Sequence, residues 1–331
     1  MNLSILDQSP ISSNQAAKDA LHESMELAKL GESLGYTRYW ITEHHDLTGL
    51  ASSAPEVMLA YIGANTNTIR IGSGAVLLPH YKPFKIAEVY NTLATLFPDR
   101  VDVGLGRAPG GSAEATNALS DNFLQNVYKM PSLLKEFLHF LNGDFPSDHE
   151  FSKISASPVP AVSPVPWLLG TGKKSALLAA ENGLAYTFGQ FMSEEDGVAI
   201  VQEYLDAFKP RKKGQKPEVI VTVSVICAET TEKANELATS TLVWALQRAK
   251  GEGKSGVPSI EEAREYLLDD LEKETLENMK KKLIIGSPTE VKAALIELQT
   301  SYKADEMMLN TITYSTEDRC NSYRLIAAEL L

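Results

Sequence analysis

The sequence predicts an α/β protein with the fold of a (β/α)8 TIM barrel with insertions, formed by residues 1–331 as a single domain. Short apolar segments rich in β-branched residues alternate with longer segments of helical period, which is typical of βαβ units around a parallel sheet. In the first third of the chain this alternation repeats about every thirty residues, the length of a strand, a helix and two short loops. The 331 residues exceed the roughly 250 of a plain barrel and lie within the range of that fold.

Eight apolar segments between turn residues are the expected strands. They are residues 3–6, 38–42, 69–78, 101–105, 167–169, 185–188, 219–227 and 307–311. Their strict alternation with helices favours a closed barrel over an open doubly wound sheet. Because barrel enzymes place their chemistry at the C-terminal ends of the strands, the residues that follow each strand are the candidates for function.

Several expected helices carry recognisable end signals. The helix 16–34 ends at Gly35, a residue suited to the left-handed conformation of a helix terminus. Ser287 and Glu290 form a capping box, with a proline at the first helical position. One long helix is expected over residues 119–141. Further helices are expected from Pro55 and over residues 84–97, 175–182, 194–208 and 317–330.

Two segments are longer than a barrel requires and are predicted to be insertions. Residues 145–166 are rich in proline and serine and form an irregular loop. Residues 231–283 are helical and charged, with a break near 251–258, so the segment near 250–283 is the second insertion. Either insertion is a candidate lid over the active site.

The composition excludes several classes of function. The chain has 31 Lys and Arg against 43 Asp and Glu, a net charge of -12, which argues against nucleic acid as a partner. No leader is visible at the first residues and no run of 18 apolar residues occurs, so no membrane association is expected. Cys227 and Cys320 are too few for a disulfide framework, which favours a reducing cytoplasm.

Glu43, His44 and His45 follow the second expected strand. The pair of histidines is compatible with one packed and one solvated imidazole, with a metal site, or with a general base at the barrel mouth. Adjacent strand residues point to opposite sides, and the other histidines offer no ligand spacing, so we expect no metal. If the pair supplies a general base, we expect one histidine to face the pocket and the other to face the wall.

Glycine-rich segments follow the third and fourth expected strands. Gly74 and Ala75 lie in the first, and the second runs from Gly104 to Gly111 and contains Arg107. The second segment lacks the spacing of a dinucleotide fingerprint, and small residues in tight turns also explain it. Arg107 nevertheless supplies a guanidinium fork at a strand end, which can bind a phosphate through two hydrogen bonds.

A third loop follows the fifth expected strand and opens a helix. It consists of Gly170, Thr171, Gly172, Lys173, Lys174 and Ser175. It lacks the first glycine of a Walker loop, and an ordinary helix cap also explains it. A loop of this kind presents backbone N–H groups and the helix dipole to an anion. Together with Arg107 it predicts a phosphate site.

The chain resembles the bacterial luciferase-like family of flavin-dependent monooxygenases over nearly its full length. The segments that carry this resemblance are LSILDQSP, WITEHH, RIGSGAVLLPHYKP, LFPDRVDVGLGRAPG, LLGTGKKSALLAAENGL, GSPTEV and ADEMMLNTIT. Their order and spacing together are specific, and they are most similar to the uncharacterised luciferase-like oxidoreductases. Light-emitting members carry a reactive cysteine where this chain has Gly106, so the resemblance does not imply bioluminescence.

The resemblance implies a two-component monooxygenase that acts on paired donors and incorporates molecular oxygen. It implies reduced FMN at the barrel mouth, supplied by a separate and transiently bound flavin reductase, and a homodimer that oxidises a small organic substrate with O2. By position, Arg107 and the loop from Gly170 to Ser175 resemble the phosphate clamp, and His44 resembles the catalytic base. Gly74 and Ala75 fall where the family has a non-proline cis peptide against the flavin ring.

Three alternatives stay open at this point. The first is hydride transfer with the deazaflavin F420, and the second is a flavin-binding protein with little turnover. The third is a barrel isomerase or aldolase that binds a sugar phosphate through Arg107 and Ser175, although an aldolase needs a strand-borne lysine that the expected strands lack.

Overall fold

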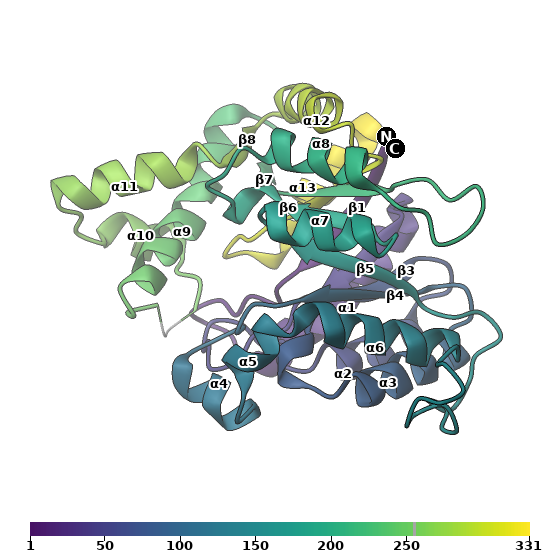
Figure 1. Ribbon diagram of the computed structural model, residues 1–331. Helices are drawn as coiled ribbons and strands as arrows, with labels where there is room; N and C mark the ends of the chain where they lie inside the picture. The colour runs from purple at the N-terminus through teal and green to yellow at the C-terminus, as the bar shows by residue number, and fades with distance from the viewer. Residues whose placement is uncertain (254–255) are drawn as a thin grey trace.

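The computed structural model describes residues 1–253 and 256–331. Eight parallel strands close into a barrel with helices outside it, which confirms the predicted fold (Figure 1). The barrel strands are β1 (Asn2–Asp7), β2 (Arg38–Ile41), β3 (Arg70–Leu77), β4 (Val101–Gly106), β5 (Val165–Gly170), β6 (Ala185–Gly189), β7 (Val219–Cys227) and β9 (Glu306–Asn310). The ring closes where β9 pairs with β1 on one side and β7 on the other.

A ninth strand, β8 (Leu283–Gly286), was not predicted. It lies outside the ring and pairs with the C-terminal half of β7, where Ser224 is opposite Leu283 and Cys227 is opposite Gly286. The expected helical insertion therefore ends in a short strand, because its last four residues are apolar and β-branched enough to extend the sheet.

Helices cover the outside of the barrel, and α6 (Met130–Asn142) is one of them. Others are α1 (Ala17–Leu34), α2 (Pro55–Asn65), α3 (Pro83–Leu96), α7 (Lys173–Glu181), α8 (Gly197–Ala207), α12 (Pro288–Tyr302) and α13 (Thr316–Leu330). As predicted, α1 ends at Gly35, whose φ of 88° is left-handed, and Ser287 and Glu290 form the capping box of α12. The two ends of the chain lie close together (Figure 1).

The expected single helix over residues 119–141 is wrong, because one helix ends at Leu119 and two further helices follow it. They are α4 (Ala113–Leu119), α5 (Phe123–Tyr128) and α6 (Met130–Asn142). Ser112 caps α4 through a hydrogen bond from the N–H of Ala115. Pro131 lies in the first turn of α6, where its missing N–H costs nothing, and it disfavours a helix that continues from α5.

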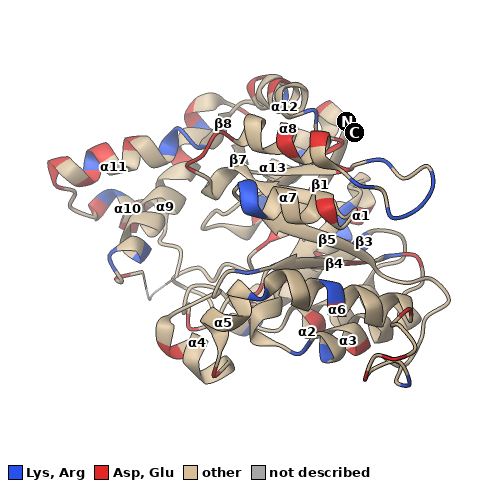
Figure 2. Ribbon diagram, in the orientation of Figure 1, with Lys and Arg blue, Asp and Glu red and all other residues tan. Residues whose placement is uncertain are grey.

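Residues 143–164 form the irregular loop that the sequence predicts, but they cannot be a lid. This loop leads into the beginning of β5 and therefore lies at the N-terminal end of the barrel. It is held there by a hydrogen bond from the side-chain amide of Asn91 to the carbonyl oxygen of Ala156 (2.7 Å). The basic turn of residues 209–216 lies at the same end, seen as the blue loop in Figure 2.

The second insertion lies at the opposite end of the barrel. It contains α9 (Thr231–Ala249), α10 (Ile260–Glu265) and α11 (Asp270–Lys280), which project beyond the strand ends (Figure 1). Val257 pairs with Ser12 in an isolated bridge and packs beside Trp244 and Ile312. The insertion is therefore fixed against the loops that follow β1 and β9.

A buried charge network fills the lower half of the barrel. The guanidinium of Arg38 donates to Asp102 (2.9 Å) and to Glu306 (2.8 Å), and Trp40 donates to Asp102 (3.0 Å). Above this network lies an apolar layer that contains Leu6 and Trp40. Together the two layers close the barrel from below, so a ligand can enter only from the C-terminal end. No helix in the described residues is long and apolar enough to span a membrane.

Candidate active site

A cavity of about 530 Å³ opens at the C-terminal ends of the strands. Its lining comes from β1, β3, β4, β5, β6 and β7 and from the loops that follow them, as barrel enzymes require. Of the predicted site residues, His44, Gly74, Ala75, Arg107, Gly170 and Thr171 line this cavity. Gly172 and Ser175 lie in the loop behind the lining.

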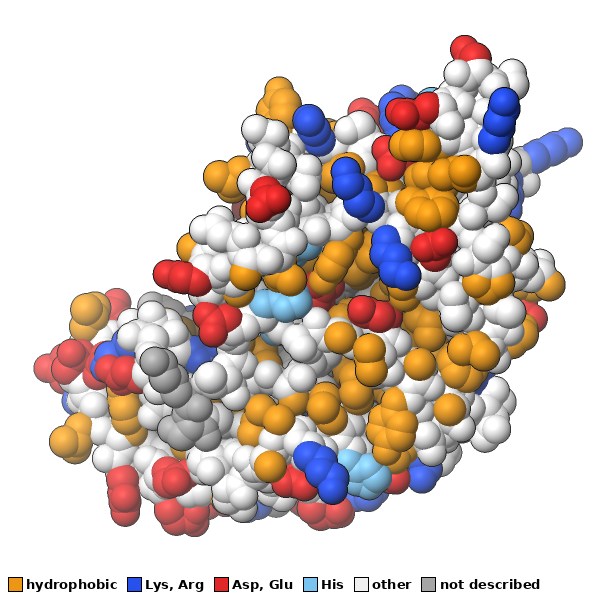
Figure 3. Space-filling model, turned by 90° about the horizontal axis from the view of Figure 1, so that it is seen from below, with side chains coloured by type: hydrophobic (Ala, Val, Ile, Leu, Met, Phe, Trp, Pro, Cys, Tyr) orange, Lys and Arg blue, Asp and Glu red, His pale blue; other side chains and the backbone are white. Residues whose placement is uncertain are grey.

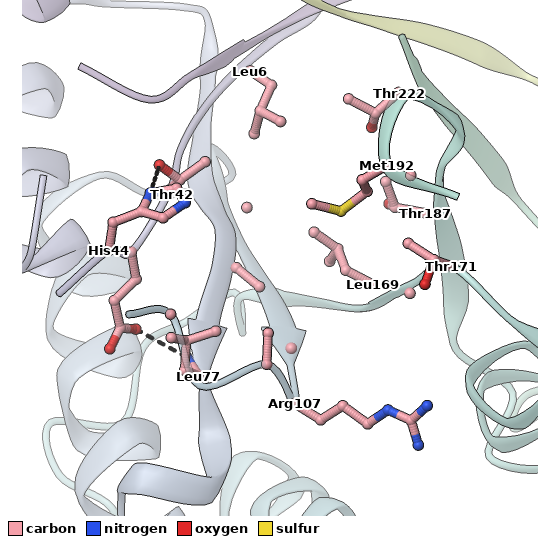
Figure 4. Close-up of a pocket in the computed structure, with 18 of the residues that line it drawn as sticks. Leu6, Thr42, His44, Leu77, Arg107, Leu169, Thr171, Thr187, Met192 and Thr222 are labelled. Carbon is pink, nitrogen blue, oxygen red and sulfur yellow. Dashed lines mark hydrogen bonds between the residues drawn. The ribbon is translucent and has the colours of Figure 1, made fainter. Parts of the chain in front are cut away.

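His44 forms one wall of the cavity (Figure 4). Its Nδ1 shares a hydrogen bond of 2.9 Å with the hydroxyl of Thr42, so the ring orientation is fixed and Nε2 is left for a ligand. Burial, the largest cause, and the nearby charge of Arg248 together lower the pKa of His44 to about 4. The imidazole is therefore neutral near pH 7 and able to accept a proton.

Glu43 does not contact the His44 ring, because its carboxylate is bound to other groups. Its carboxylate accepts hydrogen bonds from the N–H of Leu77 (2.9 Å), from the hydroxyl of Tyr81 (2.5 Å) and from His45 Nε2 (2.8 Å). As predicted for a strand-end pair, one histidine faces the cavity and the other faces the wall. Thr42 orients the ring of His44 instead. No sequence pattern marks Thr42 as a functional residue beyond its position before Glu43.

The peptide bond between Gly74 and Ala75 is cis, as the resemblance implied. A Cβ atom at Gly74 would lie 2.6 Å from Leu6 Cδ1, so a larger residue there would require the Leu6 side chain to shift. A Cβ atom at Gly106 would lie 2.9 Å from the Cβ of Ala75. The small residues therefore keep a flat surface open between the two walls of the cavity.

Arg107 projects from the end of β4 toward the wall that carries Thr171, opposite His44 (Figure 4). Its guanidinium is exposed and makes no hydrogen bond or ion pair with any residue that the structure describes. Burial raises the pKa of Tyr186 to about 12, and the charge of Arg107 acts in the opposite direction. Arg107 is therefore close enough for its charge to act on the hydroxyl of Tyr186, which contacts Ser175 in the loop of residues 170–175.

Ser175 supports the loop of residues 170–175 from behind. Its hydroxyl donates to the carbonyl oxygen of Gly172 (2.7 Å) and lies 3.1 Å from the hydroxyl of Tyr186. The side chain is therefore used inside the protein, and the groups that remain for an anion are backbone N–H groups in the first turn of α7. Lys173 pairs with Glu203 on α8 (2.8 Å).

The loops that carry His44 and Arg107 are joined. The N–H of His45 donates to the carbonyl oxygen of Gly110 (2.9 Å), and His45 pairs with Gly111 in an isolated bridge. A Cβ atom at Gly111 would lie 1.9 Å from the carbonyl oxygen of His45, so the contact requires glycine. The two sides of the site are thus held at a fixed spacing.

One lining residue had no counterpart in the sequence reasoning. Arg248, in the last turn of α9, lines the cavity although it lies far along the chain, just before the predicted insertion near residues 250–283. No local pattern marks it, because only the docking of the insertion brings it to the barrel. Within the described residues, no group of three or more His, Cys, Asp or Glu side chains is arranged to hold a metal ion.

Curated relatives match the chain over almost its whole length. The uncharacterized protein YceB of Bacillus subtilis (strain 168) is 42% identical and covers 99% of this chain and 98% of its own. The N-acetyl-S-alkylcysteine monooxygenase of the same organism is 34% identical over 100% of this chain and 98% of its own.

Solved structures give the same result. The crystal structure of apo-MsnO8 superimposes with a TM-score of 0.90 at 32% identity, covering 99% of this chain and 97% of that one. More distant structures share the fold. They include the oxygenating constituent of 3,6-diketocamphane monooxygenase of Pseudomonas putida in complex with FMN (TM-score 0.73, 17% identity) and an F420-dependent secondary alcohol dehydrogenase in complex with an F420-acetone adduct (TM-score 0.66, 14% identity).

The fold therefore occurs both in a protein that binds FMN and in a protein that binds F420. The family profile described as luciferase-like monooxygenase matches residues 1–303. With this match, the barrel and the full-length relatives, the chain belongs to the luciferase-like monooxygenase family.

Proposed function

We propose that the chain binds reduced FMN at the cavity and uses O2 to oxygenate a small organic substrate, acting on paired donors. The observation that carries this proposal is the arrangement of Arg107 and the first turn of α7 on one wall and a neutral His44 on the other, with Gly74 and Ala75 between them. An anion-binding end, a flat middle and a base fit a flavin mononucleotide better than a sugar phosphate, which needs no flat surface.

The residues of the cavity fit the cofactor in detail. Arg107 and the backbone N–H groups of Lys173 and Lys174 at the start of α7 would hold the phosphate, because these donors have no acceptor among the described residues. The cis peptide between Gly74 and Ala75 would support the isoalloxazine ring. A volume of about 530 Å³ lies within the range of pockets that enclose small ligands.

The chain's own groups define the chemistry around the cofactor. When bound, reduced flavin supplies the electrons with which O2 is activated. His44 accepts or returns a proton at Nε2, and Thr42 fixes the ring for that transfer. The apolar side chains of Leu6, Leu169 and Phe191 limit the water that reaches the reacting atoms.

The proposal also includes a flavin reductase as partner and the cytoplasm as location. No nicotinamide fingerprint occurs in the sequence, which supports electron delivery by a separate flavin reductase. Cys227 and Cys320 are free thiols, which suits a reducing cytoplasm.

A homodimer is also proposed. Val57 and Tyr61 on α2 and Leu96 on α3 are exposed, at 64%, 40% and 60%. Figure 3 shows hydrophobic side chains gathered on the face of the molecule where these helices lie. A patch of this kind on neighbouring helices supports burial against a second copy. Light scattering coupled to gel filtration should give twice the mass of the chain, and a monomer at all concentrations would reject this part of the proposal.

The experiment that tests the function is an anaerobic titration of the purified chain with reduced FMN and, in parallel, with reduced F420. Air is then admitted, and flavin reoxidation is followed by absorbance. We expect FMN to bind more tightly than F420. We also expect the bound flavin to reoxidise more slowly than free flavin, because the cavity excludes water.

Each other outcome contradicts the proposal in a distinct way. Preferential binding of F420 supports hydride transfer without oxygen. Binding of FMN with reoxidation as fast as in buffer supports a flavin-binding protein with little turnover. Binding of neither cofactor removes the flavin-dependent function altogether.

A further inference from the structure

Among the residues that the structure describes, Arg248 is the one arginine or lysine of the cavity that the proposed flavin site does not use. It lies in the last turn of α9, its side chain is half-buried, and it lines the cavity together with His44. Burying a guanidinium without a partner is costly, so an unpaired one at a cavity indicates a ligand that pairs with it.

The other buried arginines of this protein show the contrast. Arg38 lies against Asp102 and Glu306, and Arg319 lies against Asp7. These carboxylates raise the pKa of both arginines despite the opposing effect of burial. Burial lowers the pKa of Arg248, and no carboxylate in the described residues offsets it.

The two acidic side chains that line the cavity and the adjoining hollow with Arg248 already form hydrogen bonds with other groups. Glu43 lines the same cavity, but its carboxylate binds His45, Tyr81 and the N–H of Leu77. Asp46 lines the adjoining hollow with Arg248, and it accepts a hydrogen bond from Ser112 (2.6 Å). Neither forms an ion pair with Arg248.

The side chain of Arg248 is held in place by its surroundings. Its guanidinium carbon lies 4.7 Å from the ring centroid of Trp244, in cation–π contact. A Cβ atom at Gly253 would lie 2.8 Å from Arg248 Cγ, so the backbone of Gly253 packs directly against the aliphatic part. Trp244 is itself buried and donates to the carbonyl oxygen of Gly253 (3.4 Å). The arginine is thus positioned before any ligand arrives.

Arg248 and Arg107 act on different parts of the cavity. Arg248 lies at the end of α9 and also lines the adjoining hollow beside Asp46, whereas Arg107 follows β4 and projects toward the wall that carries Thr171 (Figure 4). The two arginines therefore serve two anions. Because the phosphate is assigned to Arg107 and α7, the anion at Arg248 belongs to a second molecule.

We propose that Arg248 binds the carboxylate of an organic-acid substrate and holds the apolar remainder of that substrate beside His44. One guanidinium offers two parallel N–H donors that match a carboxylate, whereas a phosphate dianion calls for further donors, such as those at Arg107 and α7. Leu6, Leu77 and Met192 line the space next to it and suit an alkyl, thioether or aryl group. This inference rests on the proposed function for its reaction, but the binding of the acid is tested separately.

The test compares matched acids and amides by isothermal titration calorimetry on the full chain, with and without FMN. The probes are hexanoate with hexanamide and 4-phenylbutanoate with 4-phenylbutanamide. We expect each acid to bind about ten-fold or more tightly than its amide, since a hydrogen bond to a charged group is replaced by a neutral one. Arg248→Met should reduce this ratio to about one, because the side chain keeps its apolar contacts and loses its charge.

Two variants separate this site from the rest of the molecule. Arg324→Met removes the same charge from an exposed ion pair on α13 and should leave the ratio unchanged. Arg107→Met should weaken FMN binding and also leave the acid-to-amide ratio unchanged. If Arg248→Met instead abolishes the preference for FMN over riboflavin, Arg248 belongs to the phosphate clamp and the inference is overturned.

A second measurement uses only the wild-type chain. The charges that act on His44 are those of Arg248 and His45, so a carboxylate at Arg248 should raise the pKa of His44, followed by NMR of its imidazole protons. The amide should leave that pKa unchanged. Acids that bind no better than their amides, or that leave the His44 pKa where it was, overturn the inference. If FMN does not bind but the acids behave as expected, the proposed function fails and the inference stands.

Discussion

His44 shows how burial and a neighbouring cation keep one imidazole neutral near pH 7. An exposed imidazole is partly protonated near pH 6, but burial and the charge of Arg248 hold the pKa of His44 near 4. The sequence predicted this residue and its direction into the cavity. It could not predict the low pKa, because the depth of the cavity and Arg248 both come from parts of the chain distant in sequence.

Replacing His44 by alanine should stop product formation and spare the cofactor. We expect the rate to fall by about 10² to 10⁴, the contribution of a positioned acid or base, and the dissociation constant for FMN to change less than about two-fold. The measurement pairs flavin fluorescence quenching with product formation on any substrate that the wild type oxidises. Wild-type turnover in the variant would remove His44 from the mechanism.

The same residue predicts a pH profile. Since the pKa of His44 is lowered to about 4, its basic form predominates above that pH and is lost below it. The wild-type rate that depends on this base should therefore stay level from pH 7 to about 5 and fall as the pH passes through about 4. A fall centred near the ordinary histidine pKa of about 6.5 would contradict the environment described for His44.

Arg107 should determine the preference for a phosphorylated flavin. Arg107→Met is expected to weaken FMN binding about ten-fold or more and to leave riboflavin binding unchanged, because only FMN carries the phosphate. Lys173→Met is the matched control, since this lysine is exposed and already paired with Glu203. Fluorescence quenching by both flavins measures the effect. Equal loss of FMN and riboflavin would place Arg107 away from the phosphate.

At the level of elements, the site depends on loops that follow neighbouring strands and on how they are joined. The sequence identified the loops after β2, β3, β4 and β5, because glycines and charged residues follow apolar strands there. It misplaced the role of Ser175, whose hydroxyl faces Tyr186, because helix-start serines look alike in sequence whichever way they point. It also merged α5 and α6 into one helix, although Pro131 in the first turn of α6 marks a new helix start.

The bridge between the loops after β2 and β4 should be sensitive to a single methyl group. Gly111→Ala places a Cβ atom 1.9 Å from the carbonyl oxygen of His45, so the two loops must separate. We expect a loss of about 1 to 3 kcal/mol in stability, typical of overpacking, together with weaker FMN binding and slower turnover. Ala113→Ser, at an exposed position in the same segment, is the control.

Gly111→Ala should reduce stability, FMN affinity and turnover together, whereas His44→Ala should reduce turnover alone. Denaturant unfolding and FMN titration of the same preparations provide both values. Unchanged FMN affinity in a destabilised Gly111→Ala chain would show that the bridge does not couple the two walls.

For the whole molecule, closure of the barrel depends on contacts between its two ends. Asp7, at the end of β1, is fully buried and accepts hydrogen bonds from Arg319 on α13, from Tyr39 and from the N–H of Ser9 (2.8 Å). The alternation of strands and helices predicted the barrel, but not this ion pair or the strand β8. The strand β8 has only four residues between charged helices, which is too short a pattern to predict a strand. Asp7 and Arg319 are 312 positions apart, so nothing in the sequence links them.

Asp7→Asn should destabilise the fold by about 3 to 5 kcal/mol, because Arg319 is left buried without its counter-charge. Burial raises the pKa of Asp7, but Arg319 and the hydrogen bonds outweigh it, so the pKa is lowered from its ordinary value of 3.8. The stability that the carboxylate provides is therefore complete above about pH 4 and is lost only as the pH falls through the lower folded value.

Urea unfolding of both chains at pH 7, 5 and 3 measures this contribution. The difference between them should be the same at pH 7 and 5 and smaller at pH 3. Glu317→Gln, which breaks the exposed pair with Arg324 on the same helix, should cost less than about 1 kcal/mol. A difference that already shrinks between pH 7 and 5 would contradict the lowered pKa.

The position of α9 outside the closed ring has an evolutionary and practical consequence. The residues assigned to the flavin come from loops after β2 to β5, whereas Arg248 belongs to the separate segment from α9 to β8, which docks as one piece at the barrel mouth. We therefore expect that exchange of this segment between family members changes the substrate preference, while the residues assigned to the flavin stay unchanged. A chimaera in which this segment is replaced by that of a relative should keep its flavin and take on the donor's choice of substrate.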